Sequence, residues 1–478
     1  MDPLLDLPDA LKAQLPPNHF LAQPRPDANA GVPDGAVDTT TLAAHDFDVD
    51  NRTGFMPPQP PLTRLPAAYE PWEVALDDAI AQRLQVGDKP GLPVAEAAKS
   101  ATWRARVDEM PLLPTESLRS SERVLRRAHQ VLAWILHFYV HTLPADAPSI
   151  TIPEPLSLPL LRVSVALQLP PVLTYSDTVL YNWAPKDDSR PSPAADNLRS
   201  NLLFTGTRDE EEFYLTSARM ELCGVEALEL MRCTLDELFV GDDLALKRIA
   251  SYLRRLAVVI KQLQTTLVSV REGCDPAVFF NDARPWMRGA DSGPNKRPWV
   301  FAGLESAPDL APPTELSGPS AGQSALIHAL DVFLGLARET HDAGAEAAAA
   351  EGRAAFLRRM QRYMPRHHRR FLDHLAAGPR PLRALVLKAG SEELTGAYND
   401  AVRAMKELRD AHMVIVTLYI IQPARKAERA AREARGEAAS APAEAKPLKG
   451  TGGTELAKFL KGVRDRTARG LLPAQGKE

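Results

Sequence analysis

The chain has 478 residues and a nearly balanced charge, with 57 lysine and arginine residues against 61 aspartate and glutamate residues, so nothing general points to a nucleic acid or a membrane as a partner. Hydrophobic residues make up 45% and charged residues 25%, which is typical of a globular protein with a sizeable core. The three cysteines form no CxxC motif, which excludes a disulfide scaffold and favours a reducing, cytoplasmic compartment.

The N-terminal segment is rich in proline, and we do not expect it to be a secretory signal. Its first residues, MDPLLD, are acidic and lack the basic region of a secretory signal. We expect residues 1–46 to form an extended, proline-rich arm. The longest apolar runs, 131–143 and 413–421, are shorter than the ~20 residues that a membrane-spanning helix needs.

Helical periodicity dominates after this arm and predicts a mainly α protein with little sheet. The clearest amphipathic pattern begins with an N-cap serine at Ser117 and runs to Leu143, with arginines on one side and apolar residues opposite. Further helices are predicted over 211–238, 244–272, 324–340, 351–375, 392–421 and 454–471.

Two polar connectors suggest how the chain is organised. The proline-rich segment 184–196 predicts a boundary between a small N-terminal domain of mixed and helical structure, 47–196, and a large all-helical domain, 197–478. The Ala/Glu/Arg-rich segment 422–449 predicts a mobile loop inside the large domain.

Two glycine-containing motifs have a functional and a structural interpretation. GPSAG at 318–322 fits the G-x-S-x-G turn of α/β-hydrolases, but the preceding residues are rich in proline and cannot form the central strand which that turn follows. A serine hydrolase is therefore disfavoured. GTGGT at 450–454 precedes the last predicted helix, where free backbone N–H groups would meet an anion, although such a segment taken alone is more often a flexible hinge with ordinary capping.

His412 is the most informative histidine. On the predicted helix 392–421 it shares an apolar face with Leu408 and Ile415. Such a residue is usually part of a core, but a neutral imidazole in an apolar wall is also what a haem iron takes as its axial ligand. Arg409, one turn earlier, would reach an anionic group of the same cofactor.

The other histidines give weaker signals. His129, His137 and His141 have no metal-binding signature, since neither HExxH nor zinc spacing occurs. His367 and His368 lie in a basic run, which predicts a solvated helix face.

Several segments together resemble the indoleamine 2,3-dioxygenase family. The clearest is AYNDAVRAMKELRDAHMVIVTLYI, followed after a charged loop by KGTGGTELAKFLKGVRDRT. Upstream are RRMQRYMPRHHRRFL and SAGQSALIHALDVFLG, preceded by LQLPPVLTYSDTVLYNW and GFMPPQPPLTRLPAAYEPW. The resemblance runs in order from about residue 47 to 471, which makes it specific.

The resemblance implies a small N-terminal domain packed on a large all-helical domain that binds haem b. His412 would be the proximal iron ligand, with Asp331 and Arg409 supporting the imidazole and a propionate. Arg284 would pair with a substrate carboxylate, to which a guanidinium is suited. The GTGGT segment would close over the pocket as a lid, with Thr451 near the substrate's ammonium and carboxylate. The distal pocket would be lined by Tyr175, Phe213, Ser217, Phe279, Phe280, Ser320, Ala321 and Gly322.

The implied reaction inserts both atoms of dioxygen across the indole C2–C3 bond of L-tryptophan and gives N-formylkynurenine, the first step of the kynurenine pathway. Ferrous haem would activate dioxygen, an electron donor would keep the iron ferrous, and neither a nucleic acid nor a membrane is implied. The route usually drawn for the family needs no general base, so Ser217 would be a hydrogen-bonding pocket residue.

Two alternatives stay open. The first is a family member that acts on another indole, such as tryptamine, D-tryptophan or a halogenated derivative. The second is a haem protein that binds dioxygen or another gas without turning over an indole, although Arg284 and the GTGGT segment argue against it. Thr178, Tyr214 and Pro319 depart from residues familiar in the family, which leaves the substrate preference open.

Overall fold

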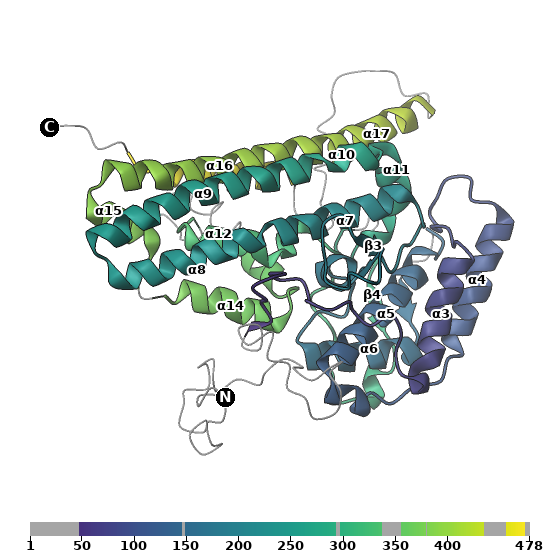
Figure 1. Ribbon diagram of the computed structural model, residues 1–478. Coiled ribbons are helices and arrows are strands. Elements are labelled where there is room, and N and C mark those ends of the chain that lie inside the picture. Colours follow the sequence, from purple (N-terminus) through teal and green to yellow (C-terminus); the bar gives the residue numbers. More distant parts are fainter. Residues whose placement is uncertain are drawn as a thin grey trace, which may run out of the picture.

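The computed structural model describes residues 47–145, 149–292, 297–336, 355–378, 380–434 and 456–473. Within these ranges the chain is mainly helical, as predicted, and its sheets are two pairs of short strands (Figure 1). None of the helices in these ranges is both long and apolar enough to cross a membrane. The predicted arm 1–46 and the GTGGT segment with Thr451 lie outside the described residues.

Helix α5 (Glu122–His141) is the centre of the N-terminal part of the fold. The side chain of Ser121 caps it by accepting a hydrogen bond from the backbone N–H of Val124. Every residue from 127 to 140 is buried, so the helix is hidden on all sides and not on one face only. The surrounding elements are η3 (Ala67–Tyr69), α3 (Glu70–Ala81), α4 (Val94–Asp108), η4 (Glu116–Ser120), α6 (Glu154–Leu167) and the parallel pair of β1 (Ile150–Ile152) with β4 (Trp299–Phe301).

The remaining helices form a bundle in which α9 (Asp243–Val268) and α16 (Glu392–Val416) lie along each other (Figure 1). Asp242 and Ser391 cap these two helices through their side chains. The apolar faces of both helices share a hydrophobic core. Packed around them are α8 (Val225–Val240), α12 (Ala325–Phe333), α14 (Arg366–Ala376), α15 (Leu382–Ala389) and α18 (Leu456–Arg469).

Two of the predicted helices are interrupted. The predicted helix 211–238 consists of α7 (Arg208–Cys223) and α8, which meet at Gly224. A Cβ atom there would lie 2.3 Å from Cδ2 of Leu326, so glycine allows α12 to approach this junction closely. The predicted helix 351–375 is interrupted at Pro365, and α14 begins at the next residue.

The segment 422–449 is helical in its first part, contrary to the prediction of a mobile loop. A π-helical turn, η10 (Thr417–Ile421), leads directly from α16 into α17 (Gln422–Ala434). Alanine, glutamate and arginine favour helix, which explains why this composition forms α17. Residues 435–449 lie outside the described part of the chain.

The polar segment 184–196 connects two strands that pair with each other. Strand β2 (Trp183–Pro185) is antiparallel to β3 (Leu198–Ser200). One hydrophobic core includes Trp134, Trp286 and Tyr419, so side chains from both sides of the segment pack together. The division into domains 47–196 and 197–478 stays a prediction.

Candidate active site

His412 lies near the end of α16, where it is half-buried and makes no hydrogen bond with any described residue. Burial and, to a smaller extent, the positive charge of Arg409 together lower the pKa of its imidazole to about 4. The ring is therefore neutral at neutral pH and keeps a nitrogen lone pair for a metal ion.

Each of the other inward-facing histidines within the described ranges makes at least one hydrogen bond, although Nδ1 of His367 and Nδ1 of His368 have no partner there. His129 contacts Asp177 and the carbonyl of Pro170, and His137 contacts the carbonyl of Trp286. His141, His328 and His368 bond to the backbone carbonyls of Arg288, Gly322 and Asp48, respectively. His367 bonds to the carboxylate of Glu122. No group of three or more histidine, cysteine or carboxylate side chains in these ranges is arranged to hold a metal ion.

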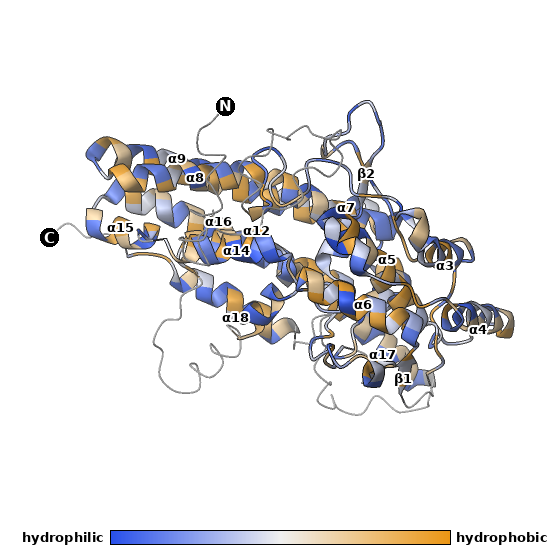
Figure 2. Cartoon of the chain, turned by 90° about the horizontal axis from the view of Figure 1, so that it is seen from below, coloured by the Kyte–Doolittle hydropathy of each residue, from blue (hydrophilic) through white to orange (hydrophobic). Residues whose placement is uncertain are grey.

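The prediction of a solvated face for His367 and His368 is wrong, because both residues are fully buried. Figure 2 shows α14 as mainly hydrophilic and α5 as mainly hydrophobic. Part of the basic run of α14 nevertheless points inward, where Arg366 pairs with Glu122 and His368 lies next to Asp48.

Arg409 and Asp331 form an ion pair beside His412. Nη2 of Arg409 lies 2.5 Å and 2.6 Å from the two carboxylate oxygens of Asp331, which α12 contributes. Nη1 of Arg409 is buried and has no partner among the described residues. Because an unpaired buried donor is costly, Nη1 is suited to an anion that does not belong to the protein, such as a carboxylate.

Aromatic side chains from two elements form a wall next to the continuation of α16. The ring centroids of Phe213 on α7 and Phe279 on η6 (Phe279–Ala283) lie 4.2 Å apart. The ring of Phe279 also lies 5.9 Å from Tyr419, which follows His412 by two turns. The carboxylate of Asp275 caps α11 (Pro276–Val278), the short turn from which η6 continues.

Arg284 begins the turn η7 (Arg284–Met287) and is buried. Its Cζ atom lies 5.6 Å from the ring centroid of Phe280, within the range of a cation–π contact. Burial and, to a smaller extent, the charge of Arg288 together lower the pKa of the guanidinium to about 10, so Arg284 is still a cation at neutral pH. A buried cation next to an aromatic ring suits a planar ligand that carries a carboxylate.

The segment with Ser320, Ala321 and Gly322 is anchored to the rest of the site by its neighbours. Ser320 caps η9 (Ala321–Gln323). Gln323 accepts a hydrogen bond of 2.8 Å from the backbone N–H of Tyr175 and donates one of 2.9 Å to the carbonyl of Gly318. A Cβ atom on Gly318 would lie 1.9 Å from the carbonyl oxygen of Met287, so the segment crosses the end of η7 in direct backbone contact.

Tyr175 and Ser217 meet at a buried carboxyl group that the sequence analysis did not identify. The hydroxyl of Tyr175 donates to Oε1 of Glu221 over 2.9 Å, and Ser217 lies close enough to the Tyr175 hydroxyl to lower its pKa, against the larger effect of burial. Ser217 and Glu221 are one turn apart on α7. That i, i+4 spacing was the available signal, but an acidic residue on a helix gives no sign of burial by itself.

The structure thus groups the predicted residues into neighbouring sets. Tyr175 contacts Ser217, Phe213 contacts Phe279, Phe280 contacts Arg284, and Asp331 contacts Arg409, whose charge reaches His412. The individual roles of these residues stay predictions.

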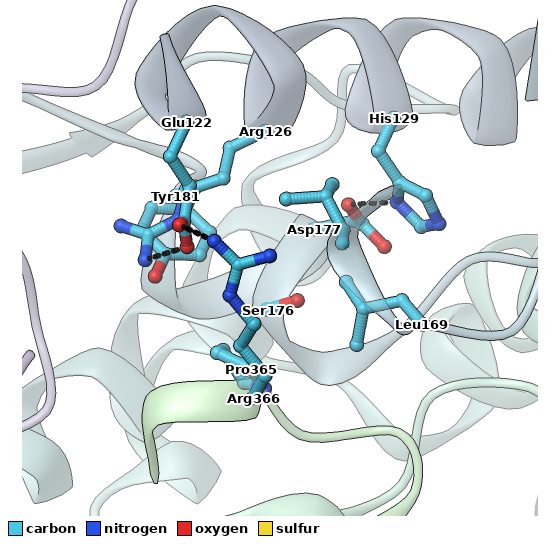
Figure 3. Close-up of a pocket in the computed structure, with 10 residues that line it drawn as sticks. Glu122, Arg126, His129, Leu169, Ser176, Asp177, Tyr181, Pro365 and Arg366 are labelled. Atoms are coloured by element: carbon cyan, nitrogen blue, oxygen red, sulfur yellow. Dashed lines mark hydrogen bonds and ion pairs between the residues drawn. The ribbon is translucent and has the colours of Figure 1, made fainter. Parts of the chain in front are cut away.

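A separate polar cavity lies between α5, η5 (Ser176–Leu180) and the start of α14, and Figure 3 shows its lining. Glu122 accepts a hydrogen bond of 2.8 Å from Arg126 and another from Arg366, while His129 lies 2.9 Å from Asp177. No predicted site residue lines this cavity. Its charges neutralise one another, which indicates a structural role.

We expect Glu122→Gln to lower the free energy of unfolding by about 3 kcal/mol at neutral pH, because buried charges lose their partner. Burial alone would raise the pKa of Glu122, but Arg126, His367 and Arg366 together hold it well below its ordinary value of 4.5. This stabilisation is complete above pH 4.5 and disappears as the pH falls towards the folded-state pKa.

Urea unfolding of the wild-type protein and of Glu122→Gln, at neutral and at acidic pH, measures the difference in their free energies of unfolding. Glu226→Gln is the matched control, because Glu226 pairs with Arg255 on the surface and should contribute less than ~1 kcal/mol. Equal losses in the two variants would contradict a structural role for the Glu122 network.

Comparison with known proteins agrees with this geometry. The family model for indoleamine 2,3-dioxygenase matches residues 43–470. The chain is 32% identical to indoleamine 2,3-dioxygenase 1 of Mus musculus, over 89% of this chain and 95% of that protein. It is 31% identical to indoleamine 2,3-dioxygenase 2 of Homo sapiens, over 95% and 99%. It is also 27% identical to 6-hydroxytryptophan 2,3-dioxygenase fscD of Fusarium equiseti, over 89% and 97%.

The fold and these matches define an oxidoreductase of the dioxygenase class. The chain belongs to the indoleamine 2,3-dioxygenase family. This family depends on haem, and the donors in the site fit such a group: the neutral imidazole of His412 suits the iron, and Nη1 of Arg409 suits a propionate.

Proposed function

We propose that this protein uses ferrous haem b to convert L-tryptophan into N-formylkynurenine, the first step of the kynurenine pathway. The observation that carries the proposal is the buried guanidinium of Arg284 beside the Phe280 ring. An aromatic amino acid supplies both a carboxylate for the cation and a ring for the apolar wall. The names of the mouse and human relatives support an indole as the substrate.

Each set of residues has a distinct task in this proposal. The imidazole of His412 holds the iron, and Arg409, oriented by Asp331, holds a propionate. Arg284 binds the substrate carboxylate, while Phe213 and Phe279 position the indole ring and exclude water. When bound, ferrous haem supplies the activation of dioxygen.

The remaining predicted residues complete the pocket. Tyr175 and Ser217 provide hydroxyl groups on the distal side, next to the wall formed by residues 320–322. Thr451 and the GTGGT segment cover the substrate. The further partners are dioxygen and an electron donor that keeps the iron ferrous, and the location is the cytoplasm.

A second candidate substrate is a modified indole. The relative from Fusarium equiseti is named for 6-hydroxytryptophan, and Thr178, Tyr214 and Pro319 alter the pocket wall of this chain. Such a substrate keeps the carboxylate that Arg284 requires. A haem protein that only binds a gas has no use for that buried cation.

The test is a turnover assay on reduced, haem-loaded protein with isotopically labelled dioxygen. The substrates are L-tryptophan, D-tryptophan, tryptamine and 6-hydroxytryptophan, and mass spectrometry detects the product. We expect L-tryptophan to gain both labelled atoms at the mass of N-formylkynurenine. If only 6-hydroxytryptophan were turned over, it would be the substrate in place of L-tryptophan. If no indole were turned over, the proposal would be refuted.

A further inference from the structure

A cavity of about 720 Å³ lies outside the candidate active site, between the loop 83–90, which follows α3, and the turns η6 and η7. Its volume falls within the range of roughly 300–1,000 Å³ that is typical of small-molecule sites. The turn 204–207, which precedes α7, forms a further wall. Of the residues that line this cavity, Phe280 alone has a place in the proposed function, because its ring contacts Arg284.

The fold holds the walls of this cavity in place. The loop 83–90 is tied to the end of α5, where the backbone N–H of Gly87 donates to the carbonyl of His141 over 2.8 Å. On another side, the carboxylate of Glu210 accepts hydrogen bonds of 2.7 Å from two backbone N–H groups of the turn 204–207. The cavity is therefore preformed, and a ligand that enters it orders little of the chain.

Two ion pairs connect the loop to η6 and to the end of η7. Nζ of Lys89 lies 3.2 Å from Asp282, and Nη1 of Arg288 lies 3.7 Å from Asp88. All four residues line the cavity, as does the exposed Arg83, so its charged lining consists of three cations and two carboxylates. This excess of positive charge favours an anionic ligand.

Arg288 is the cation with donors available for such a ligand. Its distance to Asp88 is too long for a hydrogen bond, and its guanidinium makes no hydrogen bond with any residue in the described part of the chain. The side chain is only 21% exposed, so little water can take the place of a partner. A carboxylate that binds both N–H groups of one guanidinium edge would satisfy these donors.

Aromatic side chains form the apolar part of the lining. The rings of Phe204 and Trp286 are stacked, with an angle of 1° between their planes and 5.5 Å between their centroids. Phe280 adds a third ring from η6. A planar ring packs favourably against such side chains. The cavity therefore combines a cation that can take up a carboxylate with a surface that can take up an aromatic ring.

We propose that this cavity is a second ligand site, which binds a small aromatic carboxylate through Arg288 and the aromatic residues of η6 and η7. Phe280 joins this site to the substrate pocket, because it lines the cavity while its ring centroid lies 5.6 Å from Cζ of Arg284. Arg284 begins η7 and Arg288 follows the end of the same turn.

Binding at this site weakens binding of the substrate. An anion on Arg288 lowers the positive potential around Arg284, so the substrate carboxylate is held less tightly and KM for L-tryptophan rises. This effect on KM rests on the proposed function, whereas the binding itself does not.

The experiment measures the binding of 2-naphthoate to the haem-loaded protein by isothermal titration calorimetry. Two further probes separate the chemistry of recognition, since 2-naphthamide has the same ring without the charge and cyclohexanecarboxylate has the charge without an aromatic ring. We expect 2-naphthoate to bind at least about ten-fold more tightly than either of them. Equal affinities for 2-naphthoate and 2-naphthamide would overturn the proposal.

Three variants locate the binding. Arg288→Ala should weaken it about ten-fold or more, because the guanidinium is lost. Asn281→Trp replaces an exposed lining residue and fills the cavity without changing a charge, so it should weaken binding as well. Arg255→Ala removes an exposed arginine that does not line the cavity and is the matched control. An affinity that neither Arg288→Ala nor Asn281→Trp reduces would refute the second site.

Arg284→Ala distinguishes this site from the substrate pocket, which also offers a cation and aromatic rings. Binding of 2-naphthoate should persist in Arg284→Ala, and a loss in that variant alone would assign the binding to the substrate pocket and overturn the proposal. None of these measurements needs turnover, so they decide the second site even if no indole is converted.

Kinetics test the connection between the two sites. Saturating 2-naphthoate should raise KM for L-tryptophan about five-fold in the wild-type protein and leave it unchanged in Arg288→Ala. A rise that persists in Arg288→Ala, or no rise in the wild-type protein, would contradict the connection.

Discussion

Replacing Arg284 by alanine is expected to lower kcat/KM for L-tryptophan about 100-fold, because the substrate carboxylate loses its buried cation. The haem content and absorption spectrum should stay unchanged, since the predicted haem contacts come from α12 and α16 and not from η7. Steady-state kinetics and absorption spectra of the same preparation measure both effects.

Tryptamine provides the matched control for this variant, because it has the same ring and no carboxylate. Its kcat/KM should be low in the wild-type protein and change little in Arg284→Ala. Arg284→Lys keeps the charge but loses the bidentate geometry, so intermediate activity is expected. An equal loss with tryptophan and tryptamine would show that Arg284 shapes the pocket without binding the carboxylate.

Replacing His412 by alanine is expected to abolish stable haem binding, because the imidazole beside the Arg409–Asp331 pair is lost, whereas the other buried histidines in the described ranges are each held in place by at least one hydrogen bond. Haem titration followed by absorption spectroscopy should show weak binding and an altered spectrum. Added imidazole should restore the spectrum by occupying the vacated space. His374→Ala, a change at an exposed residue of α14, should leave haem binding unchanged.

The unfolding of the haem-free protein separates loss of the ligand from loss of the fold. The His412 ring makes no hydrogen bond with the described residues, and its pKa of about 4 is below the ordinary 6.5. Stability of the haem-free wild-type protein should therefore decrease as the pH falls from 6.5 towards 4, because only the unfolded state takes up the proton. The His412→Ala variant should lose this component. A variant that folds and retains normal haem would refute the ligand assignment.

Local sequence patterns predicted an element correctly where the spacing of residues along that element alone was sufficient. The apolar stripe around His412 predicted the helix, and the 3.6-residue period places Arg409 one turn from His412 whatever packs against it. The aromatic residues and Arg284 were found through family resemblance, and periodicity alone could not have separated them from ordinary core residues.

The same patterns failed where a neighbouring element decided the outcome. The sequence predicts His367 and His368 to be solvated, yet both are buried because Glu122 and Asp48 approach from other parts of the chain. The continuous helix predicted over 211–238 is interrupted at Gly224, where Leu326 of α12 occupies the space of the missing side chain. A single-sequence pattern contains no information about such partners.

The sequence by itself determined the helical class, the main helices and the family, because these follow from short-range periodicity and from long motifs in order. Only the tertiary structure decided which side chains meet, and Glu221 shows why. Its burial, its two neutral donors, Tyr175 and Ser324, and its pKa of about 7 come from η5 and α12, which are distant in sequence. The properties of a titratable group depend on the surrounding dielectric and charges, and folding alone brings these together.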